Sequence, residues 1–188
     1  MDLLAAYGSV IAEHWTAWLV TVVLILAAVI DGFELKVPNW VTFPFILSGW
    51  LYSTLAFGWE GLGWSVVGTL IGLGLLLPAY AIGGMGAGDV KLLAGVGAWV
   101  YGTHTAYAFA VSAIVGALLA VGMVLVRRNW KKHSAQFMVI LNEILVIRDP
   151  EQLAAIAAER KPTMLLLPYG IPIAIGTIGY FVWTGMLV

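Results

Sequence analysis

Two aspartates lie at the ends of strongly apolar segments. Asp31 ends the apolar run that begins at Trp15. Asp89 begins another run and follows directly on Gly86-Ala87-Gly88. Acidic side chains are rare in such segments and usually mark a functional site. Two carboxylates held close together cannot both ionise readily, so one keeps its proton. Such a pair can activate water with the charged carboxylate and polarise a carbonyl group with the protonated one.

The composition indicates the class of protein. Of the 188 residues, 62% are hydrophobic and 10% are charged, whereas soluble domains contain about 45–50% apolar residues. We therefore expect an all-α, polytopic membrane protein. A net charge of −1 gives no electrostatic basis for binding nucleic acid. The absence of cysteine excludes disulfides and thiolate metal sites. The three histidines are far apart in the sequence, so we expect no metal and no other cofactor.

The apolar runs predict six transmembrane helices. A crossing requires about 20 residues, and only the fourth run is clearly shorter. The predicted helices span residues 15–31, 40–57, 62–82, 89–101, 104–126 and 164–186. We expect one domain, residues 1–188, with an insertion at about 127–163.

The basic residues indicate the orientation in the membrane. All nine Lys and Arg lie in segments 32–39, 83–91 and 127–163, which six alternating crossings place on one face. Basic loops remain on the cytoplasmic side. We therefore expect Asp31 and Asp89 at the cytoplasmic face of the plasma membrane, with both termini outside. The separation of 58 positions from Asp31 to Asp89 allows one crossing out and one back, so that the two carboxylates can meet.

The insertion at 127–163 is expected to be helical and to contact membrane lipid. It begins with the basic, tryptophan-containing stretch 127–132, which suits anionic head groups. Asp149-Pro150 then reads as a helix cap followed by a proline at the first helical position. We expect a helical segment that lies along the cytoplasmic interface.

The residues around each aspartate also have a structural interpretation. Gly86 and Gly88 allow a close approach of another backbone, and an aspartate in the first turn of a helix is stabilised by the free N–H groups there. Val37-Pro38-Asn39 breaks one helix and caps the next. Lys91 could extend to the interface, hold Asp89 in its charged form, or contact a substrate.

Taken together, these motifs resemble the type IV prepilin leader peptidase family of intramembrane aspartyl proteases. The resemblance is carried by Asp31 with Val37-Pro38-Asn39, by Gly86-Ala87-Gly88-Asp89-Val90-Lys91, and by Pro168-Tyr169-Gly170, in that order, and spans about residues 15–186. It implies that Asp31 and Asp89 are the catalytic pair. The residues that it implies in support of the site or in substrate binding are Gly86, Gly88, Lys91, Pro38, Asn39, Pro168, Tyr169 and Gly170.

The resemblance also implies a substrate and a setting. Members of the family remove the short basic leader of prepilins or pseudopilins at the cytoplasmic membrane surface, and pilus or secretion machinery would be the partner. Bifunctional members carry a cysteine-rich loop and also methylate the new N-terminus. The chain lacks cysteine and resembles the peptidase-only members associated with tight-adherence pili, so no N-methyltransferase activity is expected.

Other functions remain open at this point. A small ion-coupled or proton-coupled transporter could relay protons through an acidic pair, although no inverted repeat is visible. A catalytically inactive pilus assembly factor would show the same motifs. Presenilin-like proteases share Gly-x-Gly-Asp, but they place a Tyr-Asp pair on the span directly before it. Here Ile30 precedes Asp31, and two further predicted spans intervene.

Overall fold

The computed structural model describes residues 14–81, 84–126 and 167–187, together with six isolated residues between 139 and 156. The three described ranges form four helices, α2 (Trp15–Glu34), α3 (Asn39–Ala81), α4 (Ala87–Val126) and α7 (Gly170–Trp183). No strand occurs among these described residues, so the predicted all-α class is confirmed for this part of the chain. The predicted interfacial helices at 127–163 lie largely outside the described residues and stay a prediction.

The helices are those of a membrane protein. Helices α2, α3 and α4 are each long and apolar enough to cross a membrane, and the mean hydropathies of their apolar stretches are 2.2, 1.8 and 2.1. Helix α7 is a shorter apolar helix of 14 residues. The predicted class is therefore confirmed, while the number of crossings stays a prediction.

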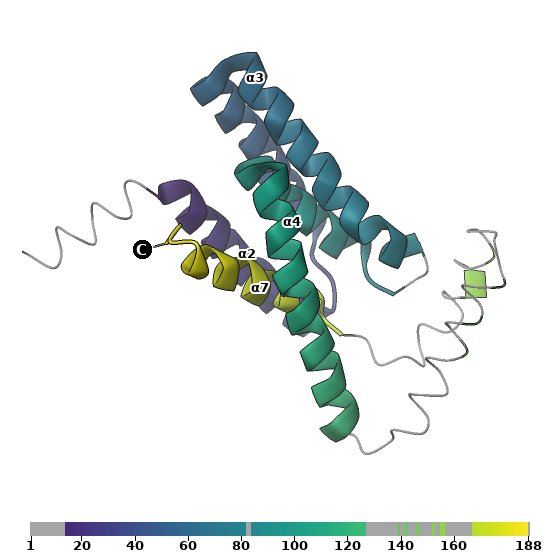
Figure 1. Cartoon of the computed structure of the whole chain (residues 1–188). Coiled ribbons are helices and arrows are strands. Elements are labelled where there is room, and N and C mark those ends of the chain that lie inside the picture. The colour runs from purple at the N-terminus through teal and green to yellow at the C-terminus, as the bar shows by residue number, and fades with distance from the viewer. Residues whose placement is uncertain are drawn as a thin grey trace, which may run out of the picture.

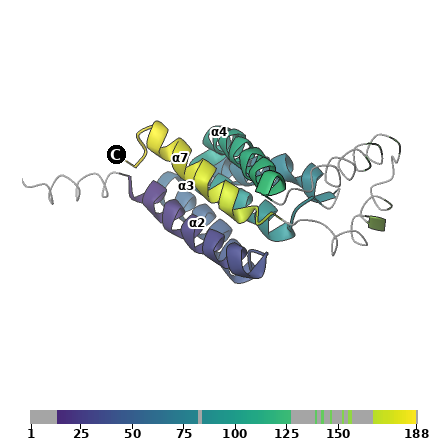
Figure 2. The same ribbon diagram turned by 90° about the horizontal axis from the view of Figure 1, so that it is seen from below.

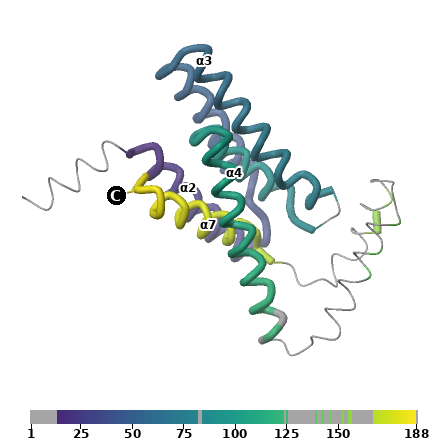
Figure 3. Tube along the Cα trace, in the orientation of Figure 1, coloured from purple at the N-terminus to yellow at the C-terminus, as the bar shows by residue number. Residues whose placement is uncertain are grey.

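Helix α3 is folded back on itself. Gly58 interrupts it with φ 67° and ψ −154°. The indole nitrogen of Trp50 donates a hydrogen bond to the Thr69 hydroxyl at 2.9 Å, although 19 residues separate them and would span ~28 Å in a straight helix. Figure 3 traces the two antiparallel arms. The reversal falls between the two spans predicted at 40–57 and 62–82, but it takes a single residue rather than a short loop.

Helix α4 also reverses direction. Tyr101 interrupts it with φ 61° and ψ 177°, at the last residue of the span predicted at 89–101 and just before the one predicted at 104–126. Met85, just before the helix, and Gly116, in its second arm, line the same cavity, which a straight helix would not permit. Every residue of the first arm from Leu92 to Val100 is buried. An arm that is apolar and buried on all sides occupies the centre of the bundle.

Small residues let the arms of α3 and α4 approach closely. A Cβ atom at Gly68 would overlap the Gly97 carbonyl oxygen, and a Cβ atom at Gly97 would overlap that of Gly68. Gly72 lies as tightly against the backbone of Leu93 and Ala94. Such contacts between backbones are typical of helix packing in membranes. Gly68, Gly72 and Gly97 are therefore packing residues.

Helix α7 packs against both α2 and α4. It runs antiparallel to α2, beside which it lies in Figures 1 and 2. On the other side, a Cβ atom at Gly176 would overlap the Ser112 backbone of α4. The Ser112 hydroxyl contacts the Ile173 carbonyl at 3.4 Å. These contacts place the start of α7 beside the end of α2.

The contact between Gly68 and Gly97 predicts a sharp difference between two alanine substitutions in α3. Gly68→Ala should lower the free energy of unfolding by about 1–3 kcal/mol, because the added methyl group forces the backbones apart. Gly74→Ala is the matched control, since a Cβ atom there meets nothing within 4 Å and alanine favours a helix by roughly 0.5–1 kcal/mol. Denaturation of the purified variants in detergent measures both. Equal effects at the two positions would contradict this packing.

Candidate active site

Asp31 lies in the last two turns of α2 and is almost completely buried, with 1% of its surface exposed. The last helical residue is Glu34, and Leu35 caps the helix in a left-handed conformation with φ 54°. The Leu35 N–H donates to the Asp31 carbonyl oxygen at 2.9 Å. The helix end thus fixes the backbone of Asp31 and directs its carboxylate into the protein.

The Asp31 carboxylate lies against the start of α7. The Gly170 N–H donates to Asp31 Oδ2 at 2.7 Å. Gly170 is the first residue of α7, and the N–H groups of a first helical turn have no partner within the helix and attract negative charge. A Cβ atom at Gly170 would lie 2.9 Å from Asp31 Oδ2 and 3.0 Å from its Cβ. Any side chain at this position would therefore displace the carboxylate.

Asp89 lies in the first turn of α4 and is 5% exposed. Its Oδ2 accepts a hydrogen bond from the Gly86 N–H at 3.1 Å, reaching back to the residue before the helix as the acidic member of a capping box does. A Cβ atom at Gly86 would lie 3.2 Å from the same oxygen. The structural interpretation of the sequence, a carboxylate at a helix N-terminus, is therefore correct for Asp89.

The loop after Asp31 packs on the segment around Asp89. A Cβ atom at Gly88 would overlap the Val37 carbonyl oxygen, so only glycine fits where these two backbone segments meet. Lys91 Nζ donates to Asn39 Oδ1 at 2.9 Å and lies 4.8 Å from the centre of the Phe43 ring. The lysine is thus bound to the loop of the first motif, a role that its position two residues after Asp89 did not reveal.

The third motif interacts with both aspartates. The Tyr169 hydroxyl lies close enough to the Asp89 carboxylate for the two to interact electrostatically, and the Gly170 N–H donates a hydrogen bond to Asp31. Two consecutive residues therefore interact with the two carboxylates. Pro168 and Pro38 start helices, since their carbonyl oxygens accept bonds from Ile171 at 3.2 Å and from Val41 at 3.1 Å. All ten residues singled out from the sequence thus lie in three segments that contact one another.

An apolar cavity of about 260 Å³ opens beside Tyr169. Its walls come from the second arms of α3 and α4 and from the first turn of α7, with Met85 at the loop before α4. The cavity was not predicted from the sequence. The signal for it is the run of small residues at helical spacing in α4, namely Ala113, Gly116, Ala117 and Ala120.

Within the described part of the chain, no group of three or more His, Asp or Glu side chains is arranged to hold a metal ion.

Comparison with known proteins identifies the family. Residues 18–121 match the type IV leader peptidase family. The chain belongs to this family. It is 31% identical over 145 residues to the prepilin leader peptidase/N-methyltransferase of Aeromonas hydrophila, a match that covers 72% of the chain and 50% of that protein. It is 32% identical over 128 residues to the protein of the same name from Aeromonas salmonicida, covering 64% and 44%.

The chain thus spans about half the length of the curated relatives that it matches. No solved structure matches it significantly.

The contact between Lys91 and Asn39 is open to a double-mutant cycle. Lys91→Ala, Asn39→Ala and the double variant should give a coupling free energy of roughly 0.5–1 kcal/mol, because the hydrogen bond is charge-assisted but partly exposed to solvent. Lys91→Ala and the double variant both lose the contact with Phe43, so the free energy of that contact cancels in the calculation of the coupling. Denaturation in detergent measures the coupling, and strictly additive effects would show that the two side chains do not interact.

Proposed function

We propose that this protein is an aspartic endopeptidase that removes the basic leader peptide of type IV prepilins or pseudopilins, with Asp31 and Asp89 as its catalytic pair. One observation carries the proposal: two buried carboxylates from separate helices interact with consecutive residues, Asp31 by a hydrogen bond from the Gly170 N–H and Asp89 electrostatically with Tyr169. Membership of the leader peptidase family supports the same chemistry.

The proposed reaction needs one charged and one protonated carboxylate. The charged member removes a proton from a water molecule, which attacks the scissile carbonyl carbon, and the protonated member donates its proton to the carbonyl oxygen. The tetrahedral intermediate then collapses, and the departing amine receives a proton from the pair. The N–H groups of Gly170 and Gly86 hold the two carboxylates in place, so that little reorganisation is needed during the reaction.

The cavity beside Tyr169 fits the apolar part of such a substrate. Prepilins, as the family resemblance implies, are cut just before a hydrophobic helix. A space of about 260 Å³ accommodates a single large apolar side chain rather than a helix. We therefore assign it to a residue next to the scissile bond, with Tyr169 between this residue and the carboxylates.

The same proposal includes the membrane topology. Six crossings would place both aspartates at the cytoplasmic face of the plasma membrane and both termini outside, because all nine basic residues then lie inside. The insertion at 127–163 would lie along this face and contact lipid, the substrate or the pilus machinery. Activity without N-methylation is also proposed, since these 188 residues contain no cysteine; the mass of the cleaved product tests this point.

Replacing either aspartate tests the catalytic pair. Asp31→Asn and Asp89→Asn should each lower the rate of cleavage by about 10²–10⁴-fold or more, because an amide cannot exchange the proton that the reaction requires. A purified candidate prepilin incubated with the enzyme in detergent gives a shortened product on a gel. Glu34→Gln is the matched control, since this exposed carboxylate lies in the last turn of α2 and should leave the rate unchanged.

The alternatives predict different results in the same variants. Cleavage that persists in both asparagine variants would rule out the catalytic pair. Proton flux into liposomes, abolished by these substitutions and accompanied by no cleavage, would identify a transporter. A folded wild-type protein that neither cleaves nor conducts would be an assembly factor.

Gly170→Ala tests the contact that orients Asp31. The added methyl group would lie within 3.0 Å of the carboxylate and displace it, and a displacement of about 1 Å can lower a rate roughly 10²-fold. The control is Gly179→Ala in the same helix, where a Cβ atom meets nothing within 4 Å. Wild-type cleavage by Gly170→Ala, measured on folded protein, would show that this contact does not position the carboxylate.

A further inference from the structure

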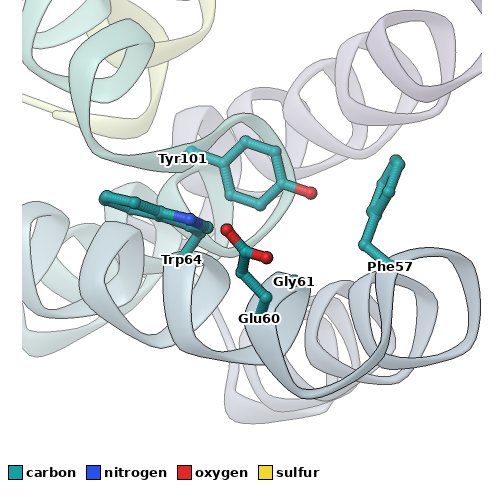
Figure 4. Close-up of a pocket in the computed structure, with 5 residues that line it drawn as sticks. All are labelled: Phe57, Glu60, Gly61, Trp64 and Tyr101. Carbon is teal, nitrogen blue, oxygen red and sulfur yellow. The ribbon is translucent and has the colours of Figure 1, made fainter.

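A second pocket lies at the opposite end of the folded helices. It has a volume of about 570 Å³ and is lined by Phe57, Glu60, Gly61, Trp64 and Tyr101, which Figure 4 shows in close-up. Tyr101 lies twelve residues after Asp89 in the first arm of α4, a distance of ~18 Å along a helix. The pocket is therefore separate from the candidate active site.

The pocket combines aromatic walls with a carboxylate. In Figure 4 the Glu60 carboxylate projects between the rings of Trp64 and Tyr101, and the Phe57 ring stands on the opposite side of Glu60 from Trp64. Aromatic faces attract cations, and cages of this kind bind organic ammonium groups. A carboxylate among such rings adds charge complementarity.

The distribution of charge isolates this carboxylate. The described part of the chain contains six charged residues, and five of them lie at positions 31–36 and 89–91, at the end that carries the candidate active site. Glu60 is the sixth and lies alone at the other end. The two described lysines, Lys36 and Lys91, lie at the opposite end, so Glu60 is the one charged side chain among the residues that line the pocket.

Tyr101 occupies the pocket in a backbone conformation that is almost exclusive to glycine. Its φ of 61° and ψ of 177° are unfavourable for any residue with a side chain. The comparable break in α3 uses a glycine, Gly58, and a glycine follows directly at position 102. Strain of this kind persists where the rest of the structure enforces it and clusters at binding and active sites. The tyrosine ring that it positions forms one wall of the pocket.

The surroundings of the pocket indicate a lipid-water boundary. The pocket lies where α3 reverses between two apolar arms. Phe57, Trp59 and Trp64 are 59%, 83% and 58% exposed, and aromatic side chains gather at the level of lipid head groups. Phospholipid head groups are the most concentrated ligands at such a boundary, so a phospholipid is the ligand that we expect in this pocket.

We propose that this pocket binds the ammonium group of an amine-bearing phospholipid head group, held by the Glu60 carboxylate and by the rings of Trp64 and Tyr101. The bound head group would contact both helix breaks, Gly61 beside the first and Tyr101 at the second. It would therefore stabilise the folded state by mass action and hold the two hairpins together at this end.

The test compares the full chain in nanodiscs of phosphatidylglycerol alone and in nanodiscs that also contain phosphatidylethanolamine. The ethanolamine lipid should raise the midpoint of thermal unfolding by about 2–4 °C, and native mass spectrometry should show it retained on the protein. Glu60→Gln and Trp64→Leu should abolish both effects. Trp59→Leu is the control, because this exposed side chain does not line the pocket, and it should respond as the wild type does.

Tyr101→Gly separates binding from folding. Glycine suits the backbone at this position, so the variant should fold, yet it should lose the response to phosphatidylethanolamine. An equal response of Glu60→Gln and the wild type would overturn the proposal, as would the absence of any response in the wild type. Tetramethylammonium, added to the protein in detergent, tests the source of the ligand. A response to this soluble cation without one to the lipid would overturn the assignment to a head group.

Discussion

The hydrogen bond from Gly170 to Asp31 is the contact on which the arrangement of the site depends. Burying a carboxylate among apolar helices is costly unless hydrogen bonds satisfy it. Asp31 obtains this bond from the first N–H group of α7. Since the donor belongs to the backbone, the position of the whole helix α7 determines where the carboxylate lies.

The two aspartates are held in different ways. Asp89 is bound by Gly86, three residues away, so that its own turn of helix fixes it. Asp31 is bound by a residue 139 positions away, and this contact exists only once α7 has packed between α2 and α4. The Asp89 half of the site therefore forms locally, whereas the Asp31 half requires the complete fold. Three glycines permit close approaches on this route: a Cβ atom at Gly88 or Gly176 would overlap the backbone of Val37 or Ser112, and one at Gly170 would crowd the Asp31 side chain.

The sequence predicted the parts of this structure that depend on local patterns. The apolar runs predicted the helices, and the loop around Pro38 and Asn39 was expected from its proline and asparagine. Gly58 lies at a predicted boundary, where glycine is an ordinary signal for a break. Tyr101 lies at the end of another predicted span, but a tyrosine in the sequence does not signal a break. Its positive φ is enforced by tertiary packing.

Contacts between distant segments could not be predicted in the same way. The motif order placed Lys91 near Asp89, but its partner is Asn39, 52 residues earlier, and no periodicity connects the two. The cavity beside Tyr169 and the pocket around Glu60 are each built from separate helices, so they appear only when the hairpins have folded. Sequence patterns could bring the two aspartates to one end of the molecule, whereas the hydrogen bond of Asp31 with Gly170 and the electrostatic interaction of Asp89 with Tyr169 needed the coordinates.

The central arm of α4 connects the two ends of the protein. Its residues from Leu92 to Val100 are buried on every side, and a closely packed interior resists local adjustment. Asp89 lies at the start of this arm and Tyr101 at its end. Because the arm is held by the same small-residue contacts along its length, a shift at one end would disturb packing at the other. The strained tyrosine and the buried aspartate are therefore two consequences of one core, in which α3 and α4 pack backbone to backbone.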